Sequence, residues 1–120
     1  MMQLVYSILI GAASGALAAL FGVGGGIIMV PAFVLMLGLQ QKQAAATSLA
    51  VIIFTSIAAS VKNTTNSLID WRLVAVTALS SAVVAWFAAG WLNTLRNDVL
   101  SRAFGVLSII VGVYMIAKQP

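Results

Sequence analysis

The 120-residue sequence contains no cysteine and no histidine, and its only two carboxylates are Asp70 and Asp98. The chain therefore has no thiolate, no imidazole base, no disulfide and no zinc site with such ligands. A Ser-His-Asp triad cannot be assembled, and two acids separated by a long apolar segment make a poor carboxylate pair or metal site. The sequence argues against an enzyme and predicts no metal and no cofactor.

Charged residues are also scarce, at 7% of the chain against 62% hydrophobic residues. Soluble domains average about 45–50% apolar and about 25% charged residues, so a soluble globule is excluded. The six cations and two acids give a net charge of +4, which is too sparse to form a nucleic-acid surface. We expect one membrane-embedded unit over residues 1–120, and its first residues lack the basic segment of a signal peptide.

Apolar segments without any charge dominate the chain. Four of them approach the length that crosses the roughly 30 Å hydrocarbon core, whereas the second covers only about 20 Å at about 1.5 Å per residue. The expected fold is an all-α membrane bundle of four full spans plus one short helix that either crosses or re-enters. The five segments are 4–21, 27–39, 44–61, 73–92 and 99–117.

The polar residues at the segment ends indicate helix caps. Asp70 is expected to cap the fourth segment, and Asn97 or Asp98 the fifth, with Asp98 and Arg102 at ion-pairing spacing. Trp71 and Trp91 flank the fourth segment, as interfacial anchors do.

Loop charges set no orientation in the membrane. Alternate crossings place three cations on each side, so the positive-inside rule favours neither direction. Either a weak bias of the α-amino group decides, or the chain inserts both ways, which would allow an antiparallel homodimer. The two groups are Lys42, Arg96 and Arg102 on one side, and Lys62, Arg72 and Lys118 on the other.

Four glycines lie within the five residues Gly22-Val23-Gly24-Gly25-Gly26, and Pro31 follows. Glycine inside a helix costs about 1 kcal/mol relative to alanine, and unwound backbone at membrane depth persists only where protein or water satisfies it. The run is therefore a tight surface turn or a helix break that lines a cavity. In the second case the N–H groups of Gly24, Gly25 and Gly26, at the positive end of a helix dipole, would bind an anion.

Two further motifs each leave two interpretations open. Thr47 and Ser48 would hydrogen-bond an oxyanion if their helix end faces the glycine run, or they bond their own helix carbonyls. Gly11 and Gly15 form a GxxxG pattern, which allows close helix packing within the chain or across a homodimer.

Together these features resemble the repeat unit of the sulfite exporter TauE/SafE family of membrane transporters. The resemblance runs nearly end to end, although family members usually carry two such repeats in one chain. It implies a half-transporter that works as a homodimer by alternating access. The residues that carry it are Gly15, 21–26, Pro31, Ala44, 47–49, 70–72 and 102–105.

The resemblance also implies a function and a site. The substrates would be small sulfur-containing anions, such as sulfite, thiosulfate or an organosulfonate, moved across a bacterial inner membrane with proton coupling. Carried onto this chain, Gly22 to Gly26 form the helix break beside Thr47 and Ser48, and Pro31 shapes the half-helix that follows.

All eight charged side chains lie near predicted segment ends, away from the positions where proton relays occur in membranes. Either the substrate carries the proton as a weak acid, or Asp70 couples the proton from a boundary. A passive channel and a non-transporting membrane scaffold are the alternative functions.

Overall fold

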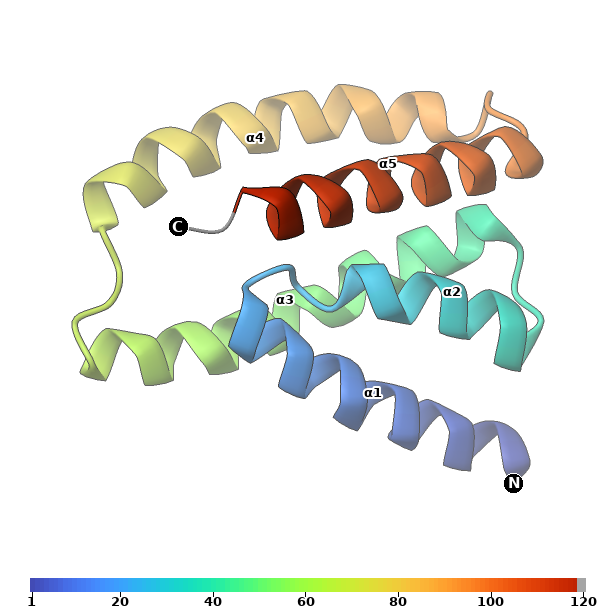
Figure 1. Ribbon diagram of the computed structural model, residues 1–120, viewed down its shortest axis with the longest axis horizontal. Coiled ribbons are helices and arrows are strands. Elements are labelled where there is room, and N and C mark those ends of the chain that lie inside the picture. Colours follow the sequence, from blue (N-terminus) through green and yellow to red (C-terminus); the bar gives the residue numbers. More distant parts are fainter. Residues whose placement is uncertain (119–120) are drawn as a thin grey trace.

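The computed structural model describes residues 1–118, which form five α-helices joined by short loops. Successive helices run in opposite directions, so the N-terminus and the end of the last helix lie at opposite ends of the bundle (Figure 1). The helices are α1 (Met2–Phe21), α2 (Gly26–Leu37), α3 (Gln41–Thr65), α4 (Trp71–Leu92) and α5 (Asn97–Ala117).

The predicted fold class is confirmed. Each apolar segment forms one helix, and α1, α3, α4 and α5 are long and apolar enough to cross a membrane. The helix α2 has 12 residues, so it is only about 18 Å long and cannot cross the hydrocarbon core alone.

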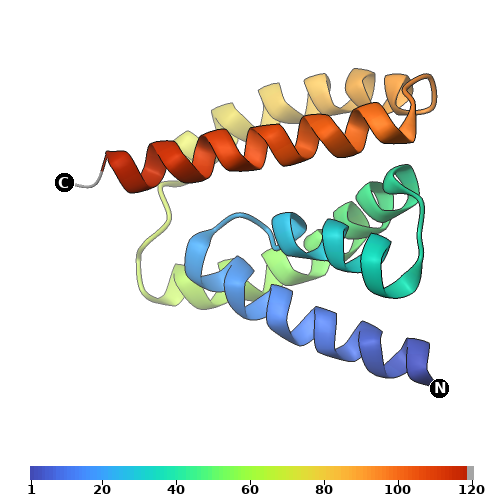
Figure 2. The ribbon, with the colours of Figure 1, turned by 45° about the vertical axis from the view of Figure 1, so that its right-hand side comes forward.

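The first three helices pack together and form the only core within the described residues. Its buried members come from α1, α2 and the first turn of α3, and they are Ile10, Met29, Val30, Phe33 and Ala44. Neither α4 nor α5 contains a buried residue. Both helices lie on one side of the three-helix group (Figure 2), where α5 rather than α4 packs against α3 and Phe104 of α5 packs against the core.

Polar contacts attach the α4–α5 hairpin to the three-helix group at one end of the bundle. The backbone N–H of Lys42 donates to Asn97 Oδ1 at 3.2 Å, and Lys42 Nζ donates to the carbonyl of Asn93 at 3.1 Å. Asn97 Nδ2 also donates to Gln40 Oε1 at 3.4 Å. The start of α3 therefore lies at the same end as the α4–α5 loop, as the count of loop cations predicted.

The N-cap predicted from the sequence is correct for α4 but not for α5. Asp70 Oδ1 accepts from the N–H groups of Arg72 and Leu73, at 3.1 and 3.2 Å, which confirms it as the cap of α4. The predicted cap of α5 is wrong: the N-cap is Arg96 with no side-chain bond. The Asn97 side chain contacts the start of α3 instead.

The predicted ion pair between Asp98 and Arg102 is also wrong. Asp98 Oδ1 lies 3.3 Å from Arg96 Nε, and both side chains are exposed. Arg96 lies just outside the helix, so its side chain reaches Asp98 without the geometric restraints of the i,i+4 spacing. An exposed pair of this kind contributes little to stability.

The glycine run forms a loop of residues 22–25 that reverses the chain between α1 and α2. Gly22, Gly24 and Gly25 have φ values of 69°, 71° and 76°, in the left-handed region that only glycine enters without cost. Gly25 is also in tight contact with α1, because a Cβ atom there would lie 2.8 Å from the carbonyl oxygen of Ser14.

We predict that Gly25→Ala lowers the free energy of unfolding by about 1–3 kcal/mol, because alanine adds left-handed strain to a clash with Ser14. The measurement is denaturation of the purified protein in detergent. Gly38→Ala is the matched control, since Gly38 also has a left-handed φ of 69° and no atom lies within 4 Å of a Cβ there. Equal stability of the two variants would contradict the importance of this contact.

Candidate functional site

The glycine loop lies against the middle of α3 rather than at an end of the bundle (Figure 1). A Cβ atom on Gly24 would lie 3.3 Å from Ile52 Cγ2, and Ile52 is near the centre of α3. From this loop α2 returns towards the end at which α1 begins. The short helix therefore covers only the first half of α3, and the glycine run is a helix break within the bundle.

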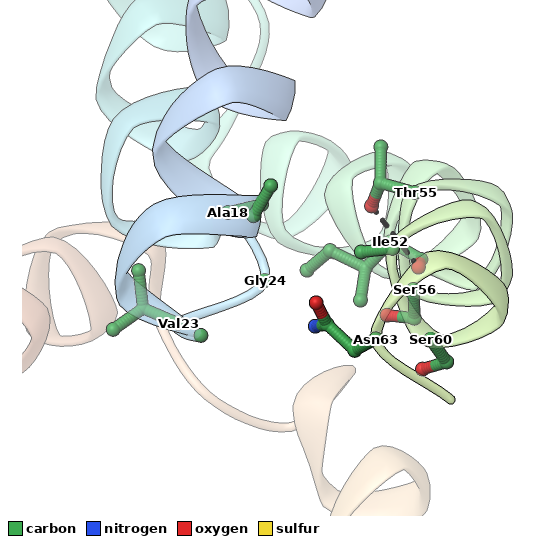
Figure 3. Close-up of a pocket in the computed structure, with 11 residues that line it drawn as sticks. Ala18, Val23, Gly24, Ile52, Thr55, Ser56, Ser60 and Asn63 are labelled. Carbon is green, nitrogen blue, oxygen red and sulfur yellow. Dashed lines mark hydrogen bonds between the residues drawn. The ribbon is translucent and has the colours of Figure 1, made fainter. Parts of the chain in front are cut away.

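Beyond the loop, the second half of α3 borders an open groove of about 410 Å³. The opposite wall comes from the last turn of α1 and the glycine loop, whose lining residues are small apart from one valine. They are Ala18, Ala19, Gly22, Val23 and Gly24. Figure 3 shows Gly24 facing α3 across this groove, while Val23 points away from α3.

One face of α3 supplies the other wall, which we name the α3 stripe. Its residues recur at the three- and four-residue spacing that places side chains on one helix face. At about 1.5 Å per residue the stripe is about 16 Å long, which is half of the roughly 30 Å hydrocarbon core. The α3 stripe consists of Ile52, Thr55, Ser56, Ala59, Ser60 and Asn63.

Three polar side chains of the stripe keep their hydrogen-bonding capacity free. Thr55 is not one of them, because its Oγ1 donates to the carbonyl of Ile52 at 3.1 Å (Figure 3). By contrast, the side chains of Ser56, Ser60 and Asn63 make no hydrogen bond within residues 1–118. Free polar groups on a membrane-spanning helix are stable where they face water, protein or a polar solute.

Backbone donors of the glycine loop add to this polar surface. The first N–H groups of a helix have no acceptor within the helix, and they carry the positive end of its dipole. At the start of α2 the carbonyl of Gly25 accepts from the N–H groups of Ile28 and Met29. Among the loop residues that line the groove, Val23 and Gly24 have N–H groups that donate to no acceptor within residues 1–118.

The structure separates the residues that the sequence suggested for a binding site. Gly22 and Gly24 line the groove, Gly25 is buried against α1, and Gly26 begins α2. Thr47 is exposed elsewhere on α3 and does not line the groove.

Ser48 is 3% exposed and lies in the half of α3 that packs with α1 and α2. Its hydroxyl donates to the carbonyl of Ala45 at 2.8 Å, one of the two interpretations that the sequence allowed. The sequence argument missed Ser60 and Asn63 because it chose Thr47 and Ser48 as neighbouring hydroxyl residues. Ser60 and Asn63 lie four and seven residues after Ser56 in an apolar segment, and this spacing is the signal that identifies them.

The remaining predicted residues lie outside the groove. Asp70 is exposed and caps α4, and α2 continues through Pro31, whose missing N–H leaves the carbonyl of Ile27 without a helical partner. At Gly11 and Gly15 no atom of residues 1–118 lies within 4 Å of an added Cβ. The close approach that the GxxxG pattern permits is thus not used within the described chain.

Comparison with known proteins gives a consistent class of relatives. The family model "Sulfite exporter TauE/SafE" matches residues 7–120. A probable membrane transporter protein of Haemophilus influenzae is 28% identical over 116 residues, covering 91% of this chain and 44% of the relative. The probable membrane transporter protein YunE of Bacillus subtilis is 30% identical over 106 residues, covering 85% and 37% respectively.

An archaeal relative, the probable membrane transporter protein MJ0441 of Methanocaldococcus jannaschii, is 30% identical over 115 residues. The match covers 90% of this chain and 43% of that protein. The chain therefore spans about two fifths of the length of these relatives. No solved structure gives a significant match.

We predict that the groove is accessible to water while the α2-covered half of α3 is not. Because the chain contains no cysteine, single Ser→Cys variants at positions 56, 60, 48 and 80 report each site separately. A membrane-impermeant thiol reagent should label Ser56→Cys and Ser60→Cys at least about tenfold faster than the variants at positions 48 and 80. The reagent reacts with the thiolate, and a thiol ionises only where water reaches it. Ser48→Cys tests the buried face, and Ser80→Cys tests the apolar surface of α4. Equal labelling rates at all four positions would contradict a water-filled groove.

Proposed function

Because the chain belongs to the sulfite exporter TauE/SafE family, we propose that it moves small sulfur-containing anions across a membrane as a secondary transporter. Its four spanning helices make it a multi-pass membrane protein, and its relatives are named probable membrane transporters. The proposed location is the bacterial inner membrane, and no nucleic acid takes part.

One observation supports the proposal most directly: the glycine loop forms part of one wall of a polar groove, and this loop lies at half the depth of the bundle. In secondary transporters, broken helices at the midplane bind substrate with their free backbone groups. Here the N–H groups of Val23 and Gly24 belong to the loop that lines the groove, opposite the hydroxyl and amide groups of the α3 stripe. An oxyanion accepts hydrogen bonds from both sets.

The same face of α3 suggests how access alternates. Ser48 lies one helical turn before Ile52 on the covered side of the glycine loop, whereas Ser56 lies one turn after it on the open side. We propose that α1 and α2 move against α3, so that the groove closes and the half near Thr47 and Ser48 opens. Gly22, Gly24, Gly25 and Gly26 stay at the centre of both states.

A second copy of the chain is the proposed partner in this movement. The chain matches about two fifths of each relative, and α4 and α5 expose apolar faces without a buried residue. Because α1 and α2 return the chain to the end at which α1 begins, helices α3 to α5 leave it at the opposite end, so a partner related by an inverted repeat lies antiparallel. Gly11 and Gly15, open to close approach, are the proposed contact.

Proton coupling in this proposal comes from the substrate. Asp70 is held at the end of α4 by two backbone N–H groups, and Asp98 lies at the start of α5 beside Arg96. A weak acid such as hydrogensulfite brings its own proton through the groove and releases it on the other side. Transport then responds to a pH gradient without a carboxylate at membrane depth.

The experiment is uptake of labelled sulfite and thiosulfate into proteoliposomes, with and without an imposed pH gradient. We expect saturable, gradient-dependent flux of at least one anion from protein with the mass of two chains. Gly24→Ala should reduce this flux about tenfold or more, because its Cβ strains the loop and displaces Ile52. Gly90→Ala, a helical position with nothing within 4 Å of its Cβ, is the matched control and should transport normally.

Two outcomes would contradict this function. Flux that never saturates and ignores the pH gradient would instead indicate a passive channel. Folded protein that moves neither anion would indicate a non-transporting scaffold.

We further predict that Asp70→Asn retains the dependence of transport on the pH gradient. Asparagine caps helices about as well as aspartate, so α4 keeps its start while the titratable group is lost. The measurement is the ratio of flux with and without the gradient in wild type and variant. If the flux of a folded Asp70→Asn variant no longer changes with the pH gradient, Asp70 takes part in proton coupling and this prediction is wrong.

A further inference from the structure

The donors that line the groove are all electrically neutral. Among residues 1–118, the lining contains the free side chains of Ser56, Ser60 and Asn63 but no ionisable side chain. Hydroxyl and amide groups donate hydrogen bonds to an oxyanion but add no positive charge. An anion in this groove would therefore be stabilised by dipoles alone.

The cation nearest to these residues in the sequence is Lys62, which does not line the groove. It precedes Asn63 in the last turns of α3 and is exposed. Lys62 lies about 9 Å from Ser56 along the helix, at about 1.5 Å per residue. Water and salt screen its charge over that distance.

Neutral donors discriminate between anions by charge. The cost of removing an ion from water rises with the square of its charge, whereas its attraction to fixed dipoles rises only in proportion to the charge. A dianion therefore leaves more of its desolvation cost uncompensated than a monoanion of the same size. A cationic side chain would offset more of this cost, because its full charge attracts each charge of the ion more strongly than a neutral donor does.

We infer that Ser56, Ser60 and Asn63 select singly charged oxyanions, with hydrogensulfite or an alkanesulfonate preferred to sulfate, thiosulfate or fully ionised sulfite. This inference rests on the proposed function and narrows its substrate class. It also explains why a groove without a carboxylate suits proton-coupled transport, since selection of hydrogensulfite selects the form that carries the proton.

Competition between two anions of similar size tests the inference. Methanesulfonate carries one negative charge and sulfate carries two, and both present three or more sulfonyl oxygens. Each is added to proteoliposomes that take up labelled sulfite, at one fixed pH on both sides. The concentration of methanesulfonate that halves uptake should be at least about tenfold lower than the concentration of sulfate that does so.

Variants assign the selectivity to the groove. Ser56→Ala and Ser60→Ala should each weaken inhibition by methanesulfonate about tenfold, because a hydrogen bond to a charged group is lost. Ser80→Ala is the control, since Ser80 lies on α4 and donates to its own helix. Ser60→Lys should reverse the order and make sulfate the better inhibitor, a gain that a damaged fold would not produce.

The results separate this inference from the proposed function. Sulfite uptake that sulfate inhibits as well as methanesulfonate does would overturn charge selection and leave the transporter intact. An unchanged inhibition order in folded Ser60→Lys would overturn the assignment to the groove. Failure of the wild type to move any sulfur oxyanion would overturn both.

Discussion

Backbone N–H and C=O groups cannot be left facing lipid, and this constraint governs the placement of the glycine loop. The chain unwinds at half the depth of the bundle, so the unwound residues must lie against protein or a wet cavity. Gly25 packs against the Ser14 carbonyl, and Gly24 against Ile52. The absence of side chains permits both contacts and the left-handed φ values. Because the loop lies at this depth, α2 is short, and the second half of α3 is left uncovered to form the groove.

The two helices that follow obey a different constraint. Water drives no hydrophobic collapse between helices in a bilayer, so α4 and α5 remain stable as spanning helices without contributing to a core. They are attached to α3 mainly through polar contacts of Lys42 and Asn97 at one end. Elsewhere their apolar faces meet lipid or another protein. Because these polar contacts lie at the start of α3, they leave α1 and α2 free to move against α3, as the proposed alternating access requires.

The helices could be predicted from sequence because the bilayer fixes a length that charge-free segments either reach or miss. The glycine run could also be identified, since no other residue tolerates such a break, but its depth depends on packing against Ile52. The choice of Thr47 and Ser48 relied on adjacency in sequence, whereas the groove follows the spacing of Ser56, Ser60 and Asn63 on one face. Which part of that face stays open depends on where α2 begins, a tertiary property. The cap of α5 differed for a similar reason, because Asn97 makes its contact with a residue 55 positions earlier.

Pairing two identical chains has a consequence for the electrostatics of the pathway. Each copy keeps its eight charged residues near helix ends, so a second copy adds neutral donors and free N–H groups around the centre but no central cation. The added donors attract an ion only in proportion to its charge, whereas its desolvation cost rises with the square of that charge, so a dianion still leaves more of this cost uncompensated than a monoanion does. Proton coupling and charge selection therefore have one physical origin in this proposal. A pathway without charged groups admits the protonated form of a sulfur oxyanion because that form costs less to remove from water.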